Sequence, residues 1–120
     1  DQVVVVRRDT LEKQSLPMAG LNRAIKDMLN DIQRGLYEKA YKLRESRTVD
    51  AHNFEELNEG VQNGFVRAMW CKETECELAI KEKTGGATTR CIPFEQKELG
   101  TICAHCGKKA KAMTYFAKAY

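Results

Sequence analysis

The chain has 120 residues, of which 42% are hydrophobic and 31% are charged, and its net charge is +3. This length suits one ordinary domain, or a small domain joined to part of a neighbour. The composition excludes a disordered chain, no apolar run approaches the roughly 20 residues that span a bilayer, and the charge is too mild to establish a nucleic-acid partner.

The first eight residues predict a strand that lacks its neighbours. Residues 2–8, QVVVVRR, are a run of β-branched side chains of the kind found in buried strands, and residues 9–20 contain the Ser, Pro and Gly of a loop. No further strand is predicted nearby, so this is an orphan strand. The chain also begins without Met and without the basic flank of a signal peptide, and we expect a fragment of a larger protein.

A long amphipathic helix is predicted from Leu21 to about Arg47. Its apolar residues recur at helical spacing and form one stripe: Leu21, Ile25, Met28, Leu29, Ile32, Leu36, Ala40 and Leu43. Such a helix would be about 40 Å long at 1.5 Å per residue. That length suits a strut between two domains.

The remainder alternates short strands and helices. Asn53 with Glu56, and Thr74 with Glu77, have the spacing of reciprocal helix caps, and glycines follow each helix at Gly64 and Gly85. The predicted fold class is α/β (α+β), in the order β-α-β-α-β-β. The strands are expected at residues 47–52, 65–70, 87–94 and 110–120, and the helices at residues 53–64 and 74–86.

Four of the five cysteines form two close pairs from distant segments. Cys71 and Cys76 have the spacing C-x4-C, and Cys103 and Cys106 have C-x2-C with a glycine directly behind. Two short loops that each supply two thiolates are typical of a structural zinc site. A redox C-x-x-C would need a helix starting at its first cysteine, and disulfides are rare in cytosolic proteins, so both are less favoured alternatives.

Three further residues have side chains that are able to bind a metal ion. His105 has the chemistry to replace a sulfur, but it lies between two ligands on a tight turn and is expected to be exposed. His52 is interpreted as structural, and Cys91 as a small buried thiol in a strand rather than a fifth ligand or nucleophile. A site closed by four thiolates has no open position at which to activate water, and no catalytic set of side chains is present elsewhere.

Basic residues gather at two places. No acidic side chain follows Glu98, whereas Lys108 and Lys109 lie close behind the second cysteine pair, and Arg7 and Arg8 end the first strand. The favoured interpretation is that these basic side chains form a solvated face of the protein. The alternative is an independent zinc-stapled module that binds RNA through these four residues.

The chain resembles the C-terminal part of prolyl-tRNA synthetases, in the form found in archaea, eukaryotes and some bacteria. The similarity rests on MLNDIQRGLYEKA (residues 28–40), GFVRAMWCKETECELAIKEKTGGATTRCIPFEQ (64–96) and CAHCGKKAKAMTYFAKAY (103–120). It implies the end of an anticodon-binding domain at residues 1–16, a connector helix at 17–47 and a zinc-binding domain at 48–120. The last of these would have a small α/β fold like the C-terminal half of bacterial translation initiation factor three.

The resemblance also implies a function. The parent would be a cytoplasmic class II aminoacyl-tRNA synthetase that uses ATP to charge tRNA(Pro) with proline, as a homodimer with no membrane partner. ATP and Mg²⁺ would bind only in the catalytic domain, which is absent here, so this fragment would have no catalytic residues of its own. Zinc would be held by Cys71, Cys76, Cys103 and Cys106, and Tyr120 with its carboxylate would support the distant active site.

Overall fold

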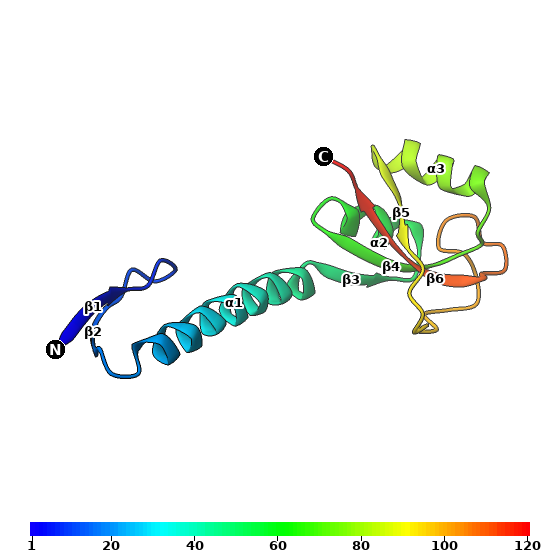
Figure 1. Ribbon diagram of the computed structural model, residues 1–120. Coiled ribbons are helices and arrows are strands. Elements are labelled where there is room, and N and C mark those ends of the chain that lie inside the picture. Colours follow the sequence, from blue (N-terminus) through cyan, green and yellow to red (C-terminus); the bar gives the residue numbers. More distant parts are fainter. The chain divides into compact units, whose positions relative to one another are not determined.

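The computed structural model describes residues 1–120 as two compact units, residues 1–42 and residues 43–120. Figure 1 shows the elements of each unit in chain order. None of the helices has both the length and the apolarity required to cross a membrane.

The first unit contains a β-hairpin and most of a helix. Strand β1 (Gln2–Val6) pairs antiparallel with β2 (Lys13–Pro17), with Val4 opposite Ser15. The expectation of an orphan strand followed by a loop over residues 9–20 is therefore wrong. Gln14 and Leu16 alternate with exposed neighbours along β2, and Pro17 is tolerated because it lies at the end of a strand on a sheet edge.

The predicted long helix is confirmed as α1 (Leu21–Ser46), which runs through the boundary between the units. Its apolar stripe is only partly covered. Ile32 is buried, but Leu29, Leu36 and Leu43 are about half exposed, at 52%, 52% and 51% of their surface. The stripe identifies one face of the helix without burying all of it.

The second unit is a four-stranded sheet with two helices. After α1 come β3 (Thr48–Ala51), α2 (Phe54–Val61), β4 (Phe65–Trp70), α3 (Thr74–Thr84), β5 (Ala87–Cys91) and β6 (Ala112–Lys118), which confirms the predicted order. The strand order in the sheet is β3-β4-β6-β5. Strands β3 and β4 are parallel with α2 between them, and the other two pairings are antiparallel.

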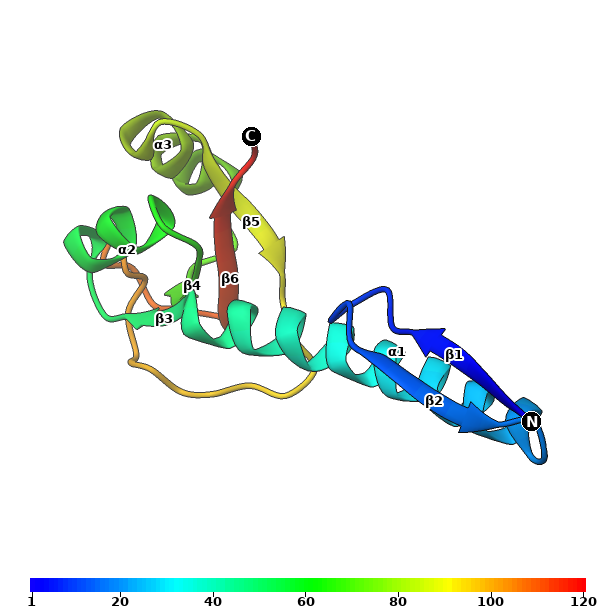
Figure 2. The same ribbon diagram turned by 90° about the vertical axis from the view of Figure 1, so that its left-hand side faces the viewer.

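Both helices lie on one face of this sheet, as Figure 2 shows. The core between them contains Leu57 of α2, Ile80 of α3, Val66 of β4 and Phe116 of β6, each no more than 1% exposed. Trp70 packs edge-to-face on Phe116, with 6.3 Å between ring centroids. The end of β4 and the adjoining part of β6 are thereby fixed against each other.

The helix caps differ in part from their predicted form. Asn53 caps α2 as expected, since its side chain accepts a hydrogen bond from the Glu56 backbone N–H. The reciprocal bond is absent because the Glu56 carboxylate instead accepts from the N–H of His52, and α2 ends at Val61, before the predicted Gly64. Gly85 ends α3 in the left-handed conformation, with φ of 76°.

The prediction that Thr74 caps α3 is wrong. Glu73 occupies the cap position without a side-chain hydrogen bond, and Thr74 is the first helical residue. Glu77 takes no part in capping the helix, because its carboxylate instead accepts hydrogen bonds from the backbone N–H and the hydroxyl of Thr89 on β5. This contact ties α3 to the edge of the sheet.

Candidate metal centre

The first cysteine pair is positioned by the end of β4 and the start of α3. Cys71 directly follows Trp70, Lys72 turns the chain with φ of 62°, and Cys76 lies in the first turn of α3. A helix N-terminus favours a negatively charged ligand at that place. The local structure therefore directs both sulfurs to the same end of the sheet.

The second pair lies on a tight turn that is tied to β4. The N–H of Cys103 donates to the Lys108 carbonyl at 2.7 Å, and the N–H of Gly107 donates to the Cys103 carbonyl at 3.2 Å. Gly107 has φ of 73°, which favours glycine there. The N–H of Ala104 reaches the Met69 carbonyl at 2.9 Å, so the turn is held beside Cys71.

The four sulfurs converge. The Cys76 and Cys103 sulfurs are 3.7 Å apart, those of Cys71 and Cys106 are 3.6 Å apart, and all four lie within 4.8 Å of one another. A tetrahedral site with zinc–sulfur bonds of about 2.3 Å places its sulfurs about 3.8 Å apart. The cluster can therefore hold a metal ion, and its donor set suits a soft or borderline cation.

Burial and hydrogen bonds act on these thiols in opposite directions. Burial raises the pKa of Cys71 and of Cys76, and the neighbouring sulfurs raise the pKa of Cys76 further. Burial acts the same way on Cys103, but backbone N–H groups of Cys106, His105 and Cys71 outweigh it and lower the pKa of Cys103. The turn thus favours a thiolate at Cys103, whereas burial favours the neutral thiol at Cys71 and Cys76.

The redox alternative lacks its structural context. Cys103 and Cys106 lie in a turn that leads to β6, with no helix starting at the first cysteine. All five cysteines are free thiols, and the closest sulfur pairs each join one cysteine of one loop to one of the other. This arrangement matches a shared site better than a thioredoxin-like dithiol.

His105 was expected to be exposed, and that expectation is wrong. The ring is half-buried and packs edge-on against Phe54, with 5.2 Å between ring centroids. Its Nδ1 lies 3.2 Å from the Cys76 sulfur and its Nε2 lies 3.0 Å from Nζ of Lys83. Sequence reasoning missed this because Phe54 and Lys83 are far from His105 along the chain.

The expectation that Cys91 is a buried core thiol is also wrong. Cys91 ends β5 and is exposed, because the pairing of β5 with β6 shifts register between Thr89 and Cys91. Such an irregularity turns a side chain away from the face that simple alternation predicts. His52 is structural as predicted: its Nδ1 lies 2.9 Å from the Leu99 carbonyl.

The predicted RNA-contact residues belong to two different units, Arg7 and Arg8 to the first and Lys108 and Lys109 to the second. Arg7 pairs with Asp9 and Asp31, each at 2.8 Å, and Lys108 pairs with Glu73 at 2.7 Å. Arg8 and Lys109 are exposed and form no ion pair. Lys108 and Lys109 flank the metal-ligand turn, whereas the two arginines lie in the other unit.

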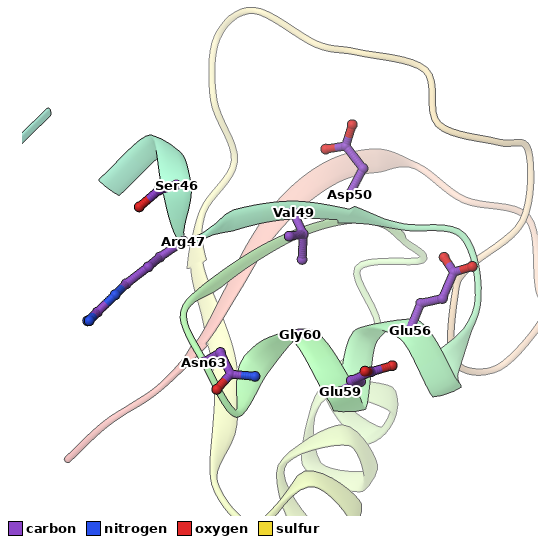
Figure 3. Close-up of a pocket in the computed structure, with 8 residues that line it drawn as sticks. All are labelled: Ser46, Arg47, Val49, Asp50, Glu56, Glu59, Gly60 and Asn63. Carbon is purple, nitrogen blue, oxygen red and sulfur yellow. The ribbon is translucent and has the colours of Figure 1, made fainter. Parts of the chain in front are cut away.

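A surface hollow of about 360 Å³ lies between β3 and α2 (Figure 3). Val49 points toward α2 in this view, whereas Asp50 points away from it. Asp50 is already paired with Arg67 at 2.6 Å and with Lys97 at 2.8 Å, and Glu56 is bound to the His52 N–H. Asp50 and Glu56 therefore serve the fold, whereas Glu59, the third carboxylate at this hollow, is exposed and forms no ion pair.

The sequence of this chain is similar to the C-terminal part of known proline–tRNA ligases. The family model described as "Prolyl-tRNA synthetase, C-terminal" matches residues 54–120. Proline–tRNA ligase 2 of Clostridioides difficile is 48% identical over 122 residues, which cover 100% of this chain and 25% of that protein. The proline–tRNA ligase of Oceanobacillus iheyensis is 43% identical over 121 residues, with the same two shares.

The fold of this chain is also similar to part of a solved prolyl-tRNA synthetase structure. The crystal structure of prolyl-tRNA synthetase from Cryptosporidium parvum, complexed with L-proline and AMP, matches with a TM-score of 0.88 at 32% identity. The match covers 99% of this chain and 26% of that one. This chain thus spans about a quarter of the length of the relatives that it matches.

Proposed function

This chain belongs to the prolyl-tRNA synthetase C-terminal family, and on that premise we propose that it is a non-catalytic, zinc-holding domain of a proline–tRNA ligase. The parent enzyme charges tRNA(Pro) with proline and consumes ATP. ATP and Mg²⁺ bind in a class II catalytic domain outside this chain. That domain and an anticodon-binding domain are its partners in a cytoplasmic homodimer.

The convergence of the four cysteines carries the proposal. Cys71, Cys76, Cys103 and Cys106 would hold Zn²⁺ as thiolates, and a fully thiolate-ligated ion has no position left for water or substrate. Its contribution is therefore structural. It would join the end of β4, the start of α3 and the turn before β6, of which the turn and β4 are also joined by backbone hydrogen bonds.

The size of the domain explains why such a staple is useful. Residues 43–120 form one small core, and domains of this size have little surplus stability. Metal binding to a site that forms only in the folded chain adds directly to the free energy of folding. The domain would then be rigid enough to stabilise and position the rest of the enzyme.

The direct test is the metal content of the chain purified without chelators. We expect one zinc per chain, and we expect Cys76→Ser to reduce it to a small fraction. Cys91→Ser is the matched control, because Cys91 is exposed and lies outside the cluster. A wild-type chain that folds natively without stoichiometric metal would contradict the zinc assignment.

Tyr120 is proposed to support the catalytic site of the parent enzyme. It is fully exposed and lies two residues beyond β6, so its side chain is available to another domain. Removing Tyr120 from the whole enzyme should lower the rate of proline charging and leave zinc content unchanged. An unchanged rate would assign Tyr120 no role in the reaction.

The exposure of Arg8 and Lys109, neither of which forms an ion pair, keeps RNA binding as a second candidate function. Phosphate contacts make affinity fall steeply as salt rises. Titrating this chain against tRNA at two salt concentrations separates the candidates. Binding at low salt that Lys109→Ala weakens would support an RNA-binding module, and no binding at low salt would remove it.

A further inference from the structure

His105 is held in one orientation by residues from two helices. It lies on the turn between Cys103 and Cys106, its ring stands at 71° to that of Phe54 at the start of α2, and its two nitrogens face opposite partners. The Nζ of Lys83 lies 5.6 Å from the centre of the Phe54 ring as well as 3.0 Å from Nε2 of His105. A histidine that only filled space would not need two polar contacts.

Lys83 decides which nitrogen of the imidazole carries the hydrogen. An ammonium group has donors and no acceptor, so a contact of 3.0 Å with Nε2 requires the lone pair of Nε2. In a neutral imidazole the hydrogen then lies on Nδ1. That N–H faces the Cys76 sulfur at 3.2 Å, which makes Nδ1 the donor and a Cys76 thiolate the acceptor.

The positions of Lys83 and Cys76 on α3 make this chain of contacts possible. They are seven residues apart, which is two helical turns, so both lie on the same face of the helix. His105 bridges them from the opposite segment. Lys83, His105 and Cys76 therefore form a chain of hydrogen bonds in which the ammonium polarises the neutral imidazole and strengthens its donor toward one ligand of the cluster.

We propose that His105 is a positioning residue that donates its Nδ1 hydrogen to the Cys76 thiolate outside the coordination sphere, and that Lys83 and Phe54 fix its tautomer and orientation. The proposal rests on the proposed zinc site. Four thiolates around one divalent cation leave two net negative charges in a mostly buried place, and a hydrogen bond to one sulfur disperses part of that charge. Partners of this kind typically change metal affinity 10- to 100-fold.

Two substitutions separate the roles of the two nitrogens. The side-chain amide of His105→Asn can place an N–H where Nδ1 lies, whereas His105→Gln places its amide near Nε2 and leaves Cys76 without a donor. Using the whole chain loaded with zinc, we would measure the zinc affinity by competition with a chromophoric chelator. We expect His105→Gln to bind zinc about 10- to 100-fold more weakly and His105→Asn to stay within about threefold of wild type.

Lys83→Met tests the tautomer argument. Without its ammonium the hydrogen is free to move to Nε2, and nitrogen-15 NMR of the imidazole should show a mixture of tautomers in place of the single Nδ1–H form. Lys81→Met, on the same helix and without a hydrogen bond to His105, is the control. A single Nε2–H form in the wild-type chain would overturn the proposal.

Cobalt substitution distinguishes a donor from a direct ligand. If His105 lies outside the coordination sphere, the d–d absorption of the Co²⁺ form keeps its four-thiolate pattern in both histidine variants. A changed pattern in His105→Gln would make His105 a ligand, and equal zinc affinity in Gln, Asn and wild type would make it inert; either result overturns this inference. Failure of the wild type to bind any metal would instead overturn the proposed function.

Discussion

Residues 1–42 have a regular apolar pattern and bury little of it, whereas residues 43–120 have shorter, weaker patterns and contain almost the entire core. Ile32 is the one buried hydrophobic side chain in the first unit. In the second, two helices cover a sheet face and a thiol cluster closes one end of it. The periodicity of apolar residues therefore identifies which face of a helix or strand is able to pack. That face becomes buried only where a second layer of secondary structure covers it.

The largest difference between the units should follow metal removal. Chelation, or Cys103→Ser, should abolish cooperative unfolding of residues 43–120, because metal binding in such sites contributes on the order of 10 kcal/mol. The fluorescence of Trp70, the single tryptophan, reports on this unit. Amide NMR signals of residues 2–17 should keep their positions, since the hairpin holds no ligand.

Cys91→Ser provides the control for chelation and for the ligand variant. It changes the fifth thiol, which is exposed, and should leave the Trp70 transition within about 0.5 kcal/mol of wild type. If the chelated wild-type chain unfolded at the same temperature as the loaded one, the second unit would not depend on metal, and this part of the comparison would be lost.

The next largest effect should come from the core. Phe116→Ala removes the largest fully buried side chain and its contact with Trp70, and should cost about 3–5 kcal/mol of unfolding free energy. Denaturant titration followed by Trp70 fluorescence measures this loss. Phe94→Ala is the matched control, because the Phe94 ring is fully exposed; a similar loss in both variants would contradict the description of the core.

Two helical glycines should respond with opposite sign to the same substitution. A Cβ on Gly60 of α2 would lie 2.5 Å from Cγ2 of Val66 and 2.9 Å from Cγ2 of Val49, so Gly60→Ala should destabilise the second unit by about 1–3 kcal/mol. A Cβ on Gly35 of α1 would meet nothing within 4 Å. Gly35→Ala should therefore stabilise its helix by about 0.5–1 kcal/mol.

Amide hydrogen exchange reads both helices in one experiment. Slower exchange around residue 35 in Gly35→Ala, together with faster exchange around residue 60 in Gly60→Ala, is the expected pair of results. If both substitutions stabilised their helices equally, the space around Gly60 would be as open as the space around Gly35, which would contradict the close packing of α2 on its sheet.

A smaller, pH-dependent effect is expected at Asp50. Burial acts to raise the pKa of this carboxyl, but hydrogen bonds from Lys97 and Arg67 outweigh it and hold the pKa below its usual value. Because the folded pKa is the lower one, the pair stabilises the fold above about pH 4 and this contribution is lost as pH falls through the folded value. Asp50→Asn should cost about 1 kcal/mol at pH 7.

Measuring the free energy of unfolding at a series of acidic pH values tests whether the contribution of Asp50 is lost as the pH falls. The wild-type chain should lose stability relative to Asp50→Asn as the pH falls below about 4. Glu59→Gln, which changes an exposed carboxylate on α2 without an ion pair, is the matched control for the loss of one carboxylate. Parallel curves for Asp50→Asn and wild type would show that the ion pairs contribute nothing.

Features decided by neighbours along the chain were predictable from sequence. The long helix, the Asn53 cap, the order of elements after Arg47 and the convergence of four cysteines all depend on spacing, and the structure confirms them. The resemblance to prolyl-tRNA synthetases is confirmed by the family model and by bacterial relatives. The domain boundaries expected from that resemblance stay a prediction.

Features decided by partners distant in sequence were not predictable. Glu77 has the spacing of a capping partner, but its carboxylate binds Thr89 across the fold. Residues 13–17 read as a loop, yet they complete a hairpin because β1 offers a free edge. His105 is half-buried by a ring contact with Phe54, and Cys91 is exposed by a register shift at a sheet edge, contrary to both expectations.

The place of β6 in the sheet has a consequence for the order of events during synthesis. Although β6 follows every other strand along the chain, it lies between β4 and β5. Phe116 of β6 pairs with Val66 of β4, which lies 50 residues earlier in the sequence. Non-local pairing of this kind is slow to form. A ribosome that has made β3, α2, β4, α3 and β5 has therefore made a sheet that lacks one of its two inner strands. The second unit can close only after residues 112–118 have emerged, and its hydrophobic face stays open to chaperones until that moment.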